Sequence, residues 1–479
     1  MLQKTEDIPE ALRRYRPLIK DWGAFRDAVE RPLPVCLRAH PARISRQALA
    51  GLLEEGGCPA QPVHWEAEAL RTDWGDQVAR HWTRMAGLFQ IQEEAALTAV
   101  RLLDPRPGEA VLDLCAAPGN KTLQIAQALG DSGVVVANDV ARGRLMPLHQ
   151  SLNRLGLINV VTTVGPGQGL PERPRYDRVL VDAPCSGEGT IRKSPAAGRP
   201  STDVERESLV ARQTTLLRRA VKLTRPGGRL VYATCTFAPE ENEGVVDAVL
   251  REFGADLRLL PARIPDLITS GGISEWAGQV YLPELGNALR LWPHQNDTGG
   301  FFVAVLEVAG APSGRDAEDG WREPERGDPD MLDRLRDHYG FGPEVFGGRG
   351  PVFGGAKYAY LTGPDVRVPT RLREERVGMP LLGLKARPPK LTTAGALRHA
   401  PEARCNVLDL EAPEAAAYLR RDSFSAARAA GGDLSRPGYV ILRHRGYGLG
   451  VGRVSETGEG ARVESLLPGS WSEWVDPPP

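Results

Sequence analysis

The chain has 479 residues, and its 60 Lys and Arg against 61 Asp and Glu give a formal net charge of −1. A nearly neutral chain has no overall positive field to attract nucleic acid, so any such contact needs a local basic face. With 41% apolar and 25% charged residues, the composition is ordinary for a soluble globular protein, and the length indicates two to four domains.

Neither a membrane anchor nor a cross-link is predicted. No apolar stretch approaches the roughly 18 residues of a membrane-spanning helix, and the N-terminus lacks the apolar core of a signal peptide, so we expect a cytoplasmic protein. There is no CxxC pair and no Cys/His spacing that suits zinc, so free thiols are expected. The cysteines are Cys36, Cys58, Cys115, Cys185, Cys235 and Cys405.

Residues 1–92 are charged and rich in tryptophan, with two short apolar runs, and they predict a small α/β domain. Basic side chains are frequent in its first half. A solvated surface and a contact with RNA both explain them, and the sequence leaves the two open. These residues are Arg13, Arg14, Arg16, Lys20, Arg26, Arg31, Arg38, Arg43 and Arg46.

Short apolar segments alternate with amphipathic ones across residues 93–309. Apolar strands separated by helices indicate an α/β fold, a parallel sheet covered on both faces. The last two segments, "LRLW" and "GFFVAVLEV", have no helix between them and predict an antiparallel hairpin at one edge. The predicted strands lie at 110–115, 134–139, 158–164, 177–183, 228–235, 289–292 and 300–308.

A change of composition marks the end of this region. Residues 310–330 are polar and rich in Pro, Gly and charge, which predicts a linker. Residues 331–479 form a separate C-terminal extension. Its last part, "GYVILRHRGYGLGVGRVSETGEGARVESLLPGS", combines alternation with glycine turns, a pattern typical of a small β-barrel.

The segment "LDLCAAPGNKT" (112–122) follows a predicted strand and opens a helix. In a doubly wound sheet this turn presents backbone N–H groups to a ligand. It matches neither the P-loop nor the GxGxxG pattern, and Asp139 ends the next strand, where an acid can bind a ribose diol. A nucleoside cofactor fits, with S-adenosylmethionine as the leading candidate. An ordinary glycine turn with a helix-capping aspartate is the alternative.

Two cysteines each follow a predicted strand, in "VLVDAPCSGEGTIRK" (179–193) and "VYATCT" (231–236). The carboxyl ends of parallel strands share one edge of the sheet, so Cys185 and Cys235 are expected in one cleft, with Asp182 beside the first. Free cysteine is often only a small buried hydrophobe, which is the alternative for each. A redox pair would usually be a CxxC.

Two thiols, an acid and a methyl donor suit methylation at carbon 5 of a pyrimidine. Carbon 5 is a poor nucleophile until a thiolate adds to carbon 6. The product then needs a base for the carbon 5 proton, and the thiolate must leave. One cysteine would be the nucleophile and the other the base or a release group. Asp182, protonated or sharing a proton, would donate to N3 of a cytosine.

Four segments together resemble the Sun-type RNA cytosine-5 methyltransferases. They are "VLDLCAAPGNKT", "VLVDAPCSGEGTIRK", "VYATCTFAPEENEGVV" and "RLWPHQNDTGGFFVA", with "GLFQIQEEAA" ahead of them, so the resemblance covers about residues 35–310. The tail, with "GMPLLGLKA" (378–386), is similar to the extension of the F-type members that act on small-subunit ribosomal RNA.

The resemblance implies a Rossmann-like core that uses S-adenosylmethionine to methylate cytidine in ribosomal RNA. It implies that Cys235 is the nucleophile, that Cys185 serves proton removal or release, and that Asp182 contacts cofactor and base. Asp139 would hold the ribose with help from Arg144. The methionine part would lie against Cys115, Ala116, Ala117, Pro118, Gly119, Asn120 and Lys121. The N-terminal part would grip RNA, and the C-terminal barrel would be a PUA-like RNA-binding module.

The chain departs from the family pattern at two places. Asn120 stands where most members have glycine, and we expect the loop to survive because Asn adopts left-handed backbone more readily than most residues. The usual aspartate after the third strand, which contacts adenine, is missing from "TTVGPGQGLPE". Backbone groups are left to recognise the adenine.

Three other readings compete with a monomeric enzyme acting on ribosomal RNA. The same chemistry on transfer RNA is the nearest alternative, since appended domains grip either target. A non-catalytic RNA-binding or ribosome-assembly factor would keep the fold without the chemistry, but both cysteines, Asp182 and Lys121 are present. A small-molecule methyltransferase would need neither the covalent thiol nor the β-rich domain.

Overall fold

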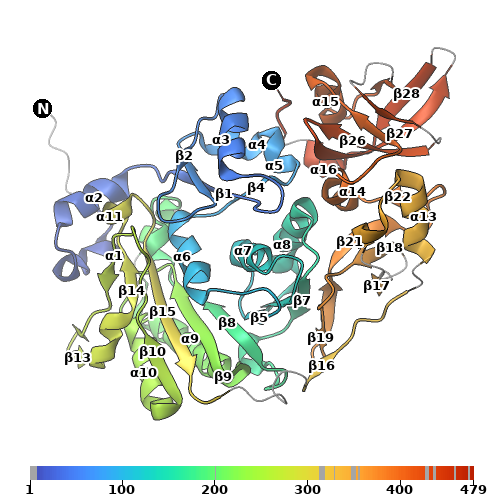
Figure 1. Ribbon diagram of the computed structural model, residues 1–479. Helices are drawn as coiled ribbons and strands as arrows, with labels where there is room; N and C mark the ends of the chain where they lie inside the picture. The colour runs from blue at the N-terminus through green and yellow to red at the C-terminus, as the bar shows by residue number, and fades with distance from the viewer. Residues whose placement is uncertain are drawn as a thin grey trace, which may run out of the picture.

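The fold is built on a ten-stranded sheet with helices on both faces, and the N-terminal sheet and the C-terminal sheets lie next to one another beside it (Figure 1). The computed structural model describes residues 8–199, 201–311, 319–327, 330–346, 352–353, 357–426, 431–434, 438–457, 460–472 and 475–478. No helix among them is long and apolar enough to cross a bilayer.

The centre of the sheet is parallel, as the sequence predicts. The strands run in the order β9, β8, β5, β6, β7, and each pairs in parallel with its neighbour. From β5 the chain continues to β6 and β7 on one side, and β8 then pairs with the other side of β5. The switch in strand order therefore lies between β5 and β8. Their bounds are β5 Ala110–Asp113, β6 Val134–Asp139, β7 Val160–Val164, β8 Tyr176–Asp182 and β9 Thr224–Thr234.

The predicted antiparallel hairpin is confirmed at one side of the sheet. Strand β15 (Phe301–Val308) pairs antiparallel with β9, and β14 (Leu289–Leu291) pairs antiparallel with β15. Strand β11 (Ser270–Gly271) extends this side, and β10 (Leu257–Leu260) pairs with β15 off the main path.

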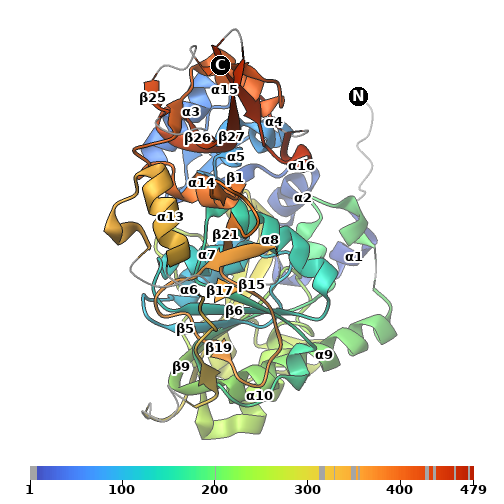
Figure 2. The same cartoon turned by 90° about the vertical axis from the view of Figure 1, so that its right-hand side faces the viewer.

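Helices cover both faces, and each covered face holds its own core (Figure 2). Residues such as Leu97, Ile125 and Leu148 pack on one face, and Leu217 and Val246 pack on the other. The first face carries α6 (Glu94–Leu103), α7 (Asn120–Ala128) and α8 (Arg142–Leu155), and the second carries α9 (Asp203–Leu223) and α10 (Glu243–Phe253).

The far edge of the sheet is closed by the C-terminal extension, which the sequence did not predict. Strand β20 (Glu374–Val377) pairs antiparallel with β7, and Arg376 donates to Asn153 Oδ1 at 2.6 Å. A charged four-residue strand carries little pattern, and it forms here because an open edge offers unpaired backbone groups. Trp321–Arg322, inside the predicted linker, also forms a strand, β16, paired with β19 (Val368–Pro369).

The two ends of the chain share one hydrophobic core. The N-terminal sheet, in the order β2, β3, β1, β4, packs through Leu37 and Trp82 against Tyr418 and Val440 of the C-terminal sheet. The N-terminal strands are β1 Val35–Ala39, β2 Gln61–Pro62, β3 Ala69–Thr72 and β4 Phe89–Ile91, with α3 Arg46–Glu55, α4 Gly75–Arg80 and α5 Trp82–Met85.

The C-terminal extension contains two sheets. The first contains β17, β18, β21 and β22 and adjoins α13 and α14; the second has six strands in the order β24, β28, β27, β26, β23, β25. The first group is β17 Val352–Phe353, β18 Tyr358–Leu361, β21 Met379–Gly383, β22 Lys390–Leu391, α13 Asp330–Tyr339 and α14 Thr393–His399. The second is β23 Val407–Asp409, β24 Phe424–Ser425, β25 Gly431–Asp433, β26 Gly438–His444, β27 Tyr447–Thr457 and β28 Gly460–Ser465, with α15 Ala412–Leu419 and α16 Gly469–Ser472.

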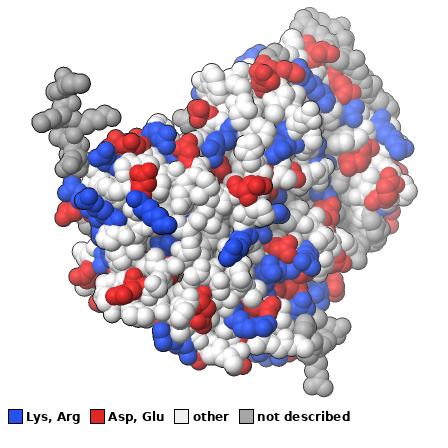
Figure 3. Space-filling model, turned by 60° about the vertical axis from the view of Figure 1, so that its left-hand side comes forward, with Lys and Arg blue, Asp and Glu red and all other residues white. Residues whose placement is uncertain are grey.

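The N-terminal basic residues do not form one basic face. Arg38 and Arg43 point into the protein, where Arg38 donates to Gln127 and Arg43 to the Ala86 carbonyl. Burial lowers the pKa of Arg43 to about 9. Arg14 pairs with Glu240. On the face seen in Figure 3, basic and acidic side chains are interspersed. Contact of the other N-terminal basic residues with RNA stays a prediction.

Candidate active site

The predicted site residues lie at the carboxyl ends of β5, β6, β8 and β9, around the switch in strand order. Crevices at this point are the usual ligand sites of open α/β sheets. Asp182 ends β8, and Cys235 follows the last residue of β9. The turn after β5 leads into α7, whose first residue is Asn120. The topology therefore gathers on one edge residues that lie over a hundred positions apart.

The turn before α7 depends on Gly119. Its φ of +118° suits glycine, and a Cβ there would come within 2.7 Å of the Leu148 side chain on α8. Asn120 lies within the helix, so the expected left-handed backbone at Asn120 is wrong. Asn120 is accommodated for another reason: its side chain oxygen accepts a hydrogen bond from Gln90 Nε2 at 2.8 Å.

Two buried carboxylates frame this turn. Asp139 Oδ2 accepts the Ala117 N–H at 3.1 Å, and Thr122 Oγ1 donates to Asp113 Oδ2 at 2.6 Å. Burial raises the pKa of Asp113 to about 7. The other oxygen of each carboxylate is buried without a hydrogen bond, although Asp139 Oδ1 lies 3.3 Å from Arg144 Nε. The turn thus offers unused acceptors at its edge.

Lys121 and Asp182 form an ion pair, with 2.7 Å between Nζ and Oδ2. Burial by itself would lower the pKa of Lys121, but the Asp182 carboxylate outweighs it and raises the pKa above its usual value. The ammonium group also lies 5.2 Å from the centre of the Phe301 ring. This contact holds Asp182 beside Lys121, and the expectation that Asp182 is protonated or shares a proton stays a prediction.

The two strand-end cysteines meet. Their Sγ atoms are 3.4 Å apart although the residues are 50 positions apart in sequence. Both thiols are free. A hydrogen bond from Cys185 lowers the pKa of Cys235 below its ordinary value, helped by the Lys121 charge and opposed by burial. The same hydrogen bond raises the pKa of Cys185. Cys235 is therefore the more acidic thiol and Cys185 the one that keeps its proton.

A network of backbone and side-chain hydrogen bonds holds the cysteine loops together. The Gly189 N–H donates to the Cys235 carbonyl at 2.9 Å, and the Gly300 N–H donates to the Gly189 carbonyl at 2.9 Å. Glu188 accepts from the Thr236 hydroxyl at 3.1 Å and from the Tyr15 hydroxyl at 2.6 Å. The last contact comes from the N-terminal segment before α2 (Trp22–Glu30), which packs on Phe237 and Trp292.

Two cavities share Cys115, Asp182 and Cys235 in their walls. The first, here called the Asp139 cavity, has a volume of about 160 Å³. Its other polar walls are Asp139, Arg144, Gln168, Cys185 and Arg212. The second, here called the Phe301 cavity, has a volume of about 240 Å³. It is lined by Asp113, Ala116, Pro118, Gly119, Asn120, Lys121, Gly300 and Phe301, among others. The structure thus divides the predicted cofactor residues between two cavities that join at Cys235.

Sequence reasoning missed three residues that line these cavities. Gln168, in the loop after β7, stands in the Asp139 cavity where the usual adenine-contacting aspartate is absent. Arg212 on α9 enters the same cavity, and Phe301 on β15 forms a wall of the other. Gln168 lies among glycines in "GPGQG", a pattern that predicts a loop and could have drawn attention to this residue. Arg212 was hidden because it projects from the middle of an amphipathic helix.

The Asp139 cavity fits S-adenosylmethionine. The buried, unpartnered oxygen of Asp139 provides the acceptor that a ribose hydroxyl needs. The Ala117 N–H bond fixes that carboxylate in place. Arg144, which is more than half exposed at its side chain, stands beside Asp139 and is free to move aside.

Comparison with protein families gives two matches. Residues 100–307 match the family of the 16S rRNA methyltransferase RsmB/F, and residues 405–468 match the PUA domain of methyltransferase RsmF. These matches confirm the predicted methyltransferase core and the PUA-like domain at the C-terminal end.

Known proteins are similar over most of the chain. The ribosomal RNA small subunit methyltransferase F of Aeromonas hydrophila is 31% identical over 463 residues, covering 93% of this chain and 92% of that protein. The tRNA (cytosine(49)-C(5))-methyltransferase of Pyrococcus abyssi is 34% identical and covers 62% of this chain and 94% of its own length. A solved methyltransferase homologue from Pyrococcus horikoshii is 34% identical, with a TM-score of 0.53, over 60% of this chain and 91% of that one.

Proposed function

Because the chain belongs to the RsmB/F family of 16S rRNA methyltransferases, and so is an S-adenosylmethionine-dependent RNA cytosine-5 methyltransferase, we propose that it methylates small-subunit ribosomal RNA through a covalent cysteine–base intermediate. The observation that carries the proposal is the thiol pair: Cys185 and Cys235 meet at 3.4 Å where the two cavities join.

Cys235 acts as the nucleophile. Its lowered pKa provides the thiolate, and its sulfur attacks carbon 6 of a cytosine in the Phe301 cavity. The new S–C6 bond moves an electron pair of the C5=C6 bond toward carbon 5. Lys121, raised in pKa and paired with Asp182, supplies the proton that N3 takes up as the ring becomes an enamine, while Asp182 accepts from the exocyclic amine.

S-adenosylmethionine supplies the methyl group that carbon 5 takes up. Asp139 would bind its ribose, and Gln168 would offer an amide to its adenine in place of the missing aspartate. The turn from Cys115 to Lys121 borders both cavities and would hold the methionine part. Arg144 and Arg212 add positive charge to the wall of the Asp139 cavity.

Cys185 completes the cycle as the base. In the free enzyme it keeps its proton because it donates to the Cys235 thiolate. Once the Cys235 sulfur is bonded to carbon, that acceptor charge is gone and the pKa of Cys185 falls. The Cys185 thiol loses its proton to solvent, and the resulting thiolate removes the carbon 5 proton. As the C5=C6 bond re-forms, the electron pair of the S–C6 bond leaves with Cys235 and N3 returns its proton to Lys121.

Ribosomal RNA is the proposed target because the likeness to the Aeromonas hydrophila protein extends through the C-terminal extension. The match to the transfer RNA enzyme covers 62% of the chain.

We propose the domain division 1–92, 93–309 and 331–479 with a linker between the last two, and RNA contact by both flanking domains of a monomer. The shared core between the N-terminal and C-terminal sheets supports their action as one unit.

Bisulfite sequencing of ribosomal and transfer RNA from cells with and without the gene tests this proposal. We expect the loss of one or more sites in small-subunit RNA, restored by the wild-type gene and not by Cys235→Ala. Loss in transfer RNA alone would move the same chemistry to that target. No change in either RNA would indicate a methyltransferase fold that only binds RNA.

A further inference from the structure

Two hollows outside the active site meet at Trp471, a half-buried residue on α16. The first, about 660 Å³, lies between α4, α5, the C-terminal half of α8 and the C-terminal segment. The second, about 770 Å³, lies between the two sheets of the C-terminal extension. Because the indole stands in both walls, the hollows form one groove divided by an aromatic ring, here called the Trp471 groove.

The charged walls of the Trp471 groove are all positive. Among the described residues, none that lines either hollow is acidic. The first hollow is lined by Arg80, Arg84 and Arg154, and the second by Lys357, Lys385 and Lys390. A chain with a net charge of −1 has thus placed six cationic side chains around one ring. Such an arrangement favours an anionic partner with flat groups.

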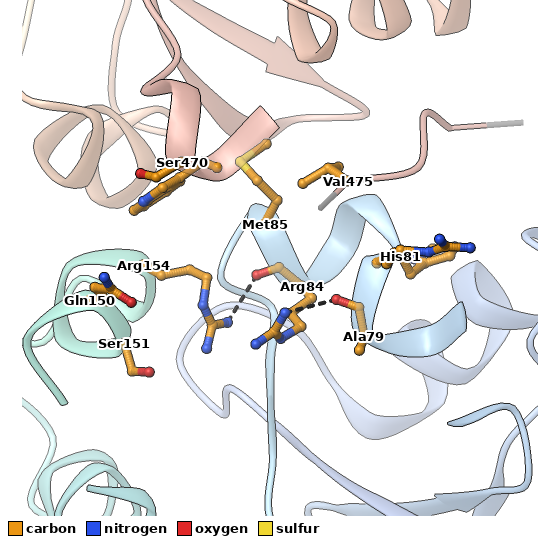
Figure 4. A pocket seen from close by; sticks show the side chains of 11 residues that line it. Ala79, His81, Arg84, Met85, Gln150, Ser151, Arg154, Ser470 and Val475 are labelled. Carbon is orange, nitrogen blue, oxygen red and sulfur yellow. Dashed lines mark hydrogen bonds between the residues drawn. The ribbon is translucent and has the colours of Figure 1, made fainter. Parts of the chain in front are cut away.

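Arg80 pairs with Asp476 at 3.3 Å, and the other five charges have no carboxylate partner among the described residues. Arg84 donates to the Ala79 carbonyl at 2.8 Å and Arg154 to the Arg84 carbonyl at 2.9 Å, and Figure 4 shows both guanidinium groups beside the hollow. Within the described part of the chain, neither arginine forms an ion pair, and Arg84 Nε is buried without a hydrogen bond. Arg154 is buried and also donates to the Phe89 carbonyl and to Gln90, so its guanidinium group is held inside the protein, and burial lowers its pKa to about 9.

The second hollow combines its cations with aromatic and apolar surface. Lys357 Nζ lies 5.2 Å from the ring centre of Tyr358, and Lys390 Nζ lies 5.3 Å from that of Tyr439. Its floor includes Leu391, Val451 and Leu466. Lysines at the rim and apolar groups below suit a nucleotide whose phosphate stays outside while its base turns inward.

We propose that the Trp471 groove binds a single-stranded segment of RNA, with one base stacked on Trp471 and the flanking phosphates held by the lysines of the second hollow. The inference rests on the proposed RNA substrate, and it adds a binding site outside the cavities where the chemistry takes place. Stacking on an aromatic ring is tolerant of sequence because every base has a π face.

The groove has a direct physical connection to the cofactor turn. Arg154, in the first hollow, donates to Gln90 Oε1, and Gln90 donates to Asn120 at the start of α7. Along α8, Arg144 beside Asp139 and Arg154 in the hollow are separated by about 15 Å at the rise of an α-helix. RNA in the groove would therefore be held at a fixed distance from the cofactor cavity.

The test is the fluorescence anisotropy of a fluorescein-labelled 12-nucleotide oligouridine with the full chain. This probe contains no cytidine, so its binding is separate from methyl transfer. We expect Trp471→Ala to raise Kd about tenfold, since stacking of one base contributes about that much affinity. The combined Lys357→Ala, Lys385→Ala and Lys390→Ala variant should lower the slope of log Kd against log salt by about 2, at about 0.7 per phosphate contact.

Matched variants distinguish binding in the Trp471 groove from the general effects of removing a tryptophan or a lysine. Trp74→Ala removes another exposed tryptophan, outside the groove, and Lys222→Ala removes a lysine that pairs with Glu172; both should leave Kd unchanged. Trp471→Phe keeps an aromatic ring in the core contact and should restore most of the affinity, which guards against a folding defect in the alanine variant. Unchanged Kd in Trp471→Ala together with an unchanged salt slope in the triple lysine variant would overturn the proposal, whatever Cys235→Ala does to methylation.

Discussion

The catalytic edge of the sheet and the Trp471 groove use positive charge in opposite ways. At the edge, Lys121 lies 2.7 Å from the Asp182 carboxylate, and this pair is largely buried. In the groove, Arg84, Arg154 and the lysines are without ion pairs among the described residues. A paired charge is fixed in place and has little attraction left for a distant phosphate, whereas an unpaired one attracts anions. Whether a basic residue serves the chemistry or the proposed RNA binding therefore depends on where it lies and what it pairs with, not on how many basic residues the chain has.

The largest effect is expected at the nucleophile. Cys235→Ala removes the proposed nucleophile, whose sulfur lies 3.4 Å from that of Cys185, so methylation should fall at least about 10³-fold. Affinity for oligouridine should not change, because the groove is elsewhere. Methyl transfer from labelled S-adenosylmethionine and anisotropy measure the two effects on one preparation. Cys405→Ala, a free cysteine of the C-terminal extension, is the control, and activity retained in Cys235→Ala would remove the covalent step.

Breaking the ion pair between Lys121 and Asp182 is the most direct test of the difference between the paired charge at the sheet edge and the unpaired charges of the groove. Lys121→Met breaks the pair and leaves Asp182 without its donor, so we expect kcat to fall about 10²- to 10³-fold. The triple lysine variant of the groove should instead raise KM for RNA and leave kcat near the wild-type value. Arg218→Ala breaks the exposed pair with Glu252 and should alter neither, since exposed pairs contribute about 0–1 kcal/mol. Equal losses of kcat in all three would contradict the comparison.

Cys185 should affect both the release of product and the acidity of Cys235. Cys185→Ala should lower kcat about 10²-fold and leave a slowly migrating protein–RNA adduct through Cys235 on denaturing gels. It also removes the hydrogen bond that lowers the pKa of Cys235. The pKa of Cys235 therefore rises, and the pH midpoint of its alkylation, followed by peptide mass spectrometry, should shift toward alkaline pH.

The matched variant for that shift is Cys185→Ser. Serine keeps a hydrogen-bond donor beside the Cys235 sulfur, so its alkylation midpoint should lie between those of the wild type and Cys185→Ala. A midpoint that is the same in all three proteins would mean that Cys185 does not set the acidity of the nucleophile. Absence of the adduct in Cys185→Ala would separately remove its role in release.

The smallest effect is expected at Gln168, which lines the Asp139 cavity and which we propose takes the place of the usual aspartate. Gln168→Ala should weaken S-adenosylmethionine binding about 3- to 10-fold, the contribution of a single hydrogen bond. Isothermal titration calorimetry measures it directly, and affinity for oligouridine is the internal control. Gln168→Asp tests the replacement: if backbone groups alone recognise adenine, as the sequence indicates, neither variant should change the Kd.

The sequence by itself determined the framework and the chemistry. The alternation of apolar strands and helices predicted the parallel sheet, and the strand ends predicted that Cys185, Cys235 and Asp182 would share one edge. These features are local, because the period of an apolar pattern and the position of a turn are set by neighbouring residues. The motif that follows each strand was therefore readable without any knowledge of how the strands are ordered.

Only the tertiary structure decided which groups touch. It brought Lys121 to Asp182; it turned Arg38 inward and joined Arg43 to the Ala86 carbonyl; and it added β20 to the edge of the sheet. It also placed Trp471 between cations that are remote in sequence. The protonation of a group and its exposure depend on partners brought by packing from distant parts of the chain, and no local pattern encodes those partners.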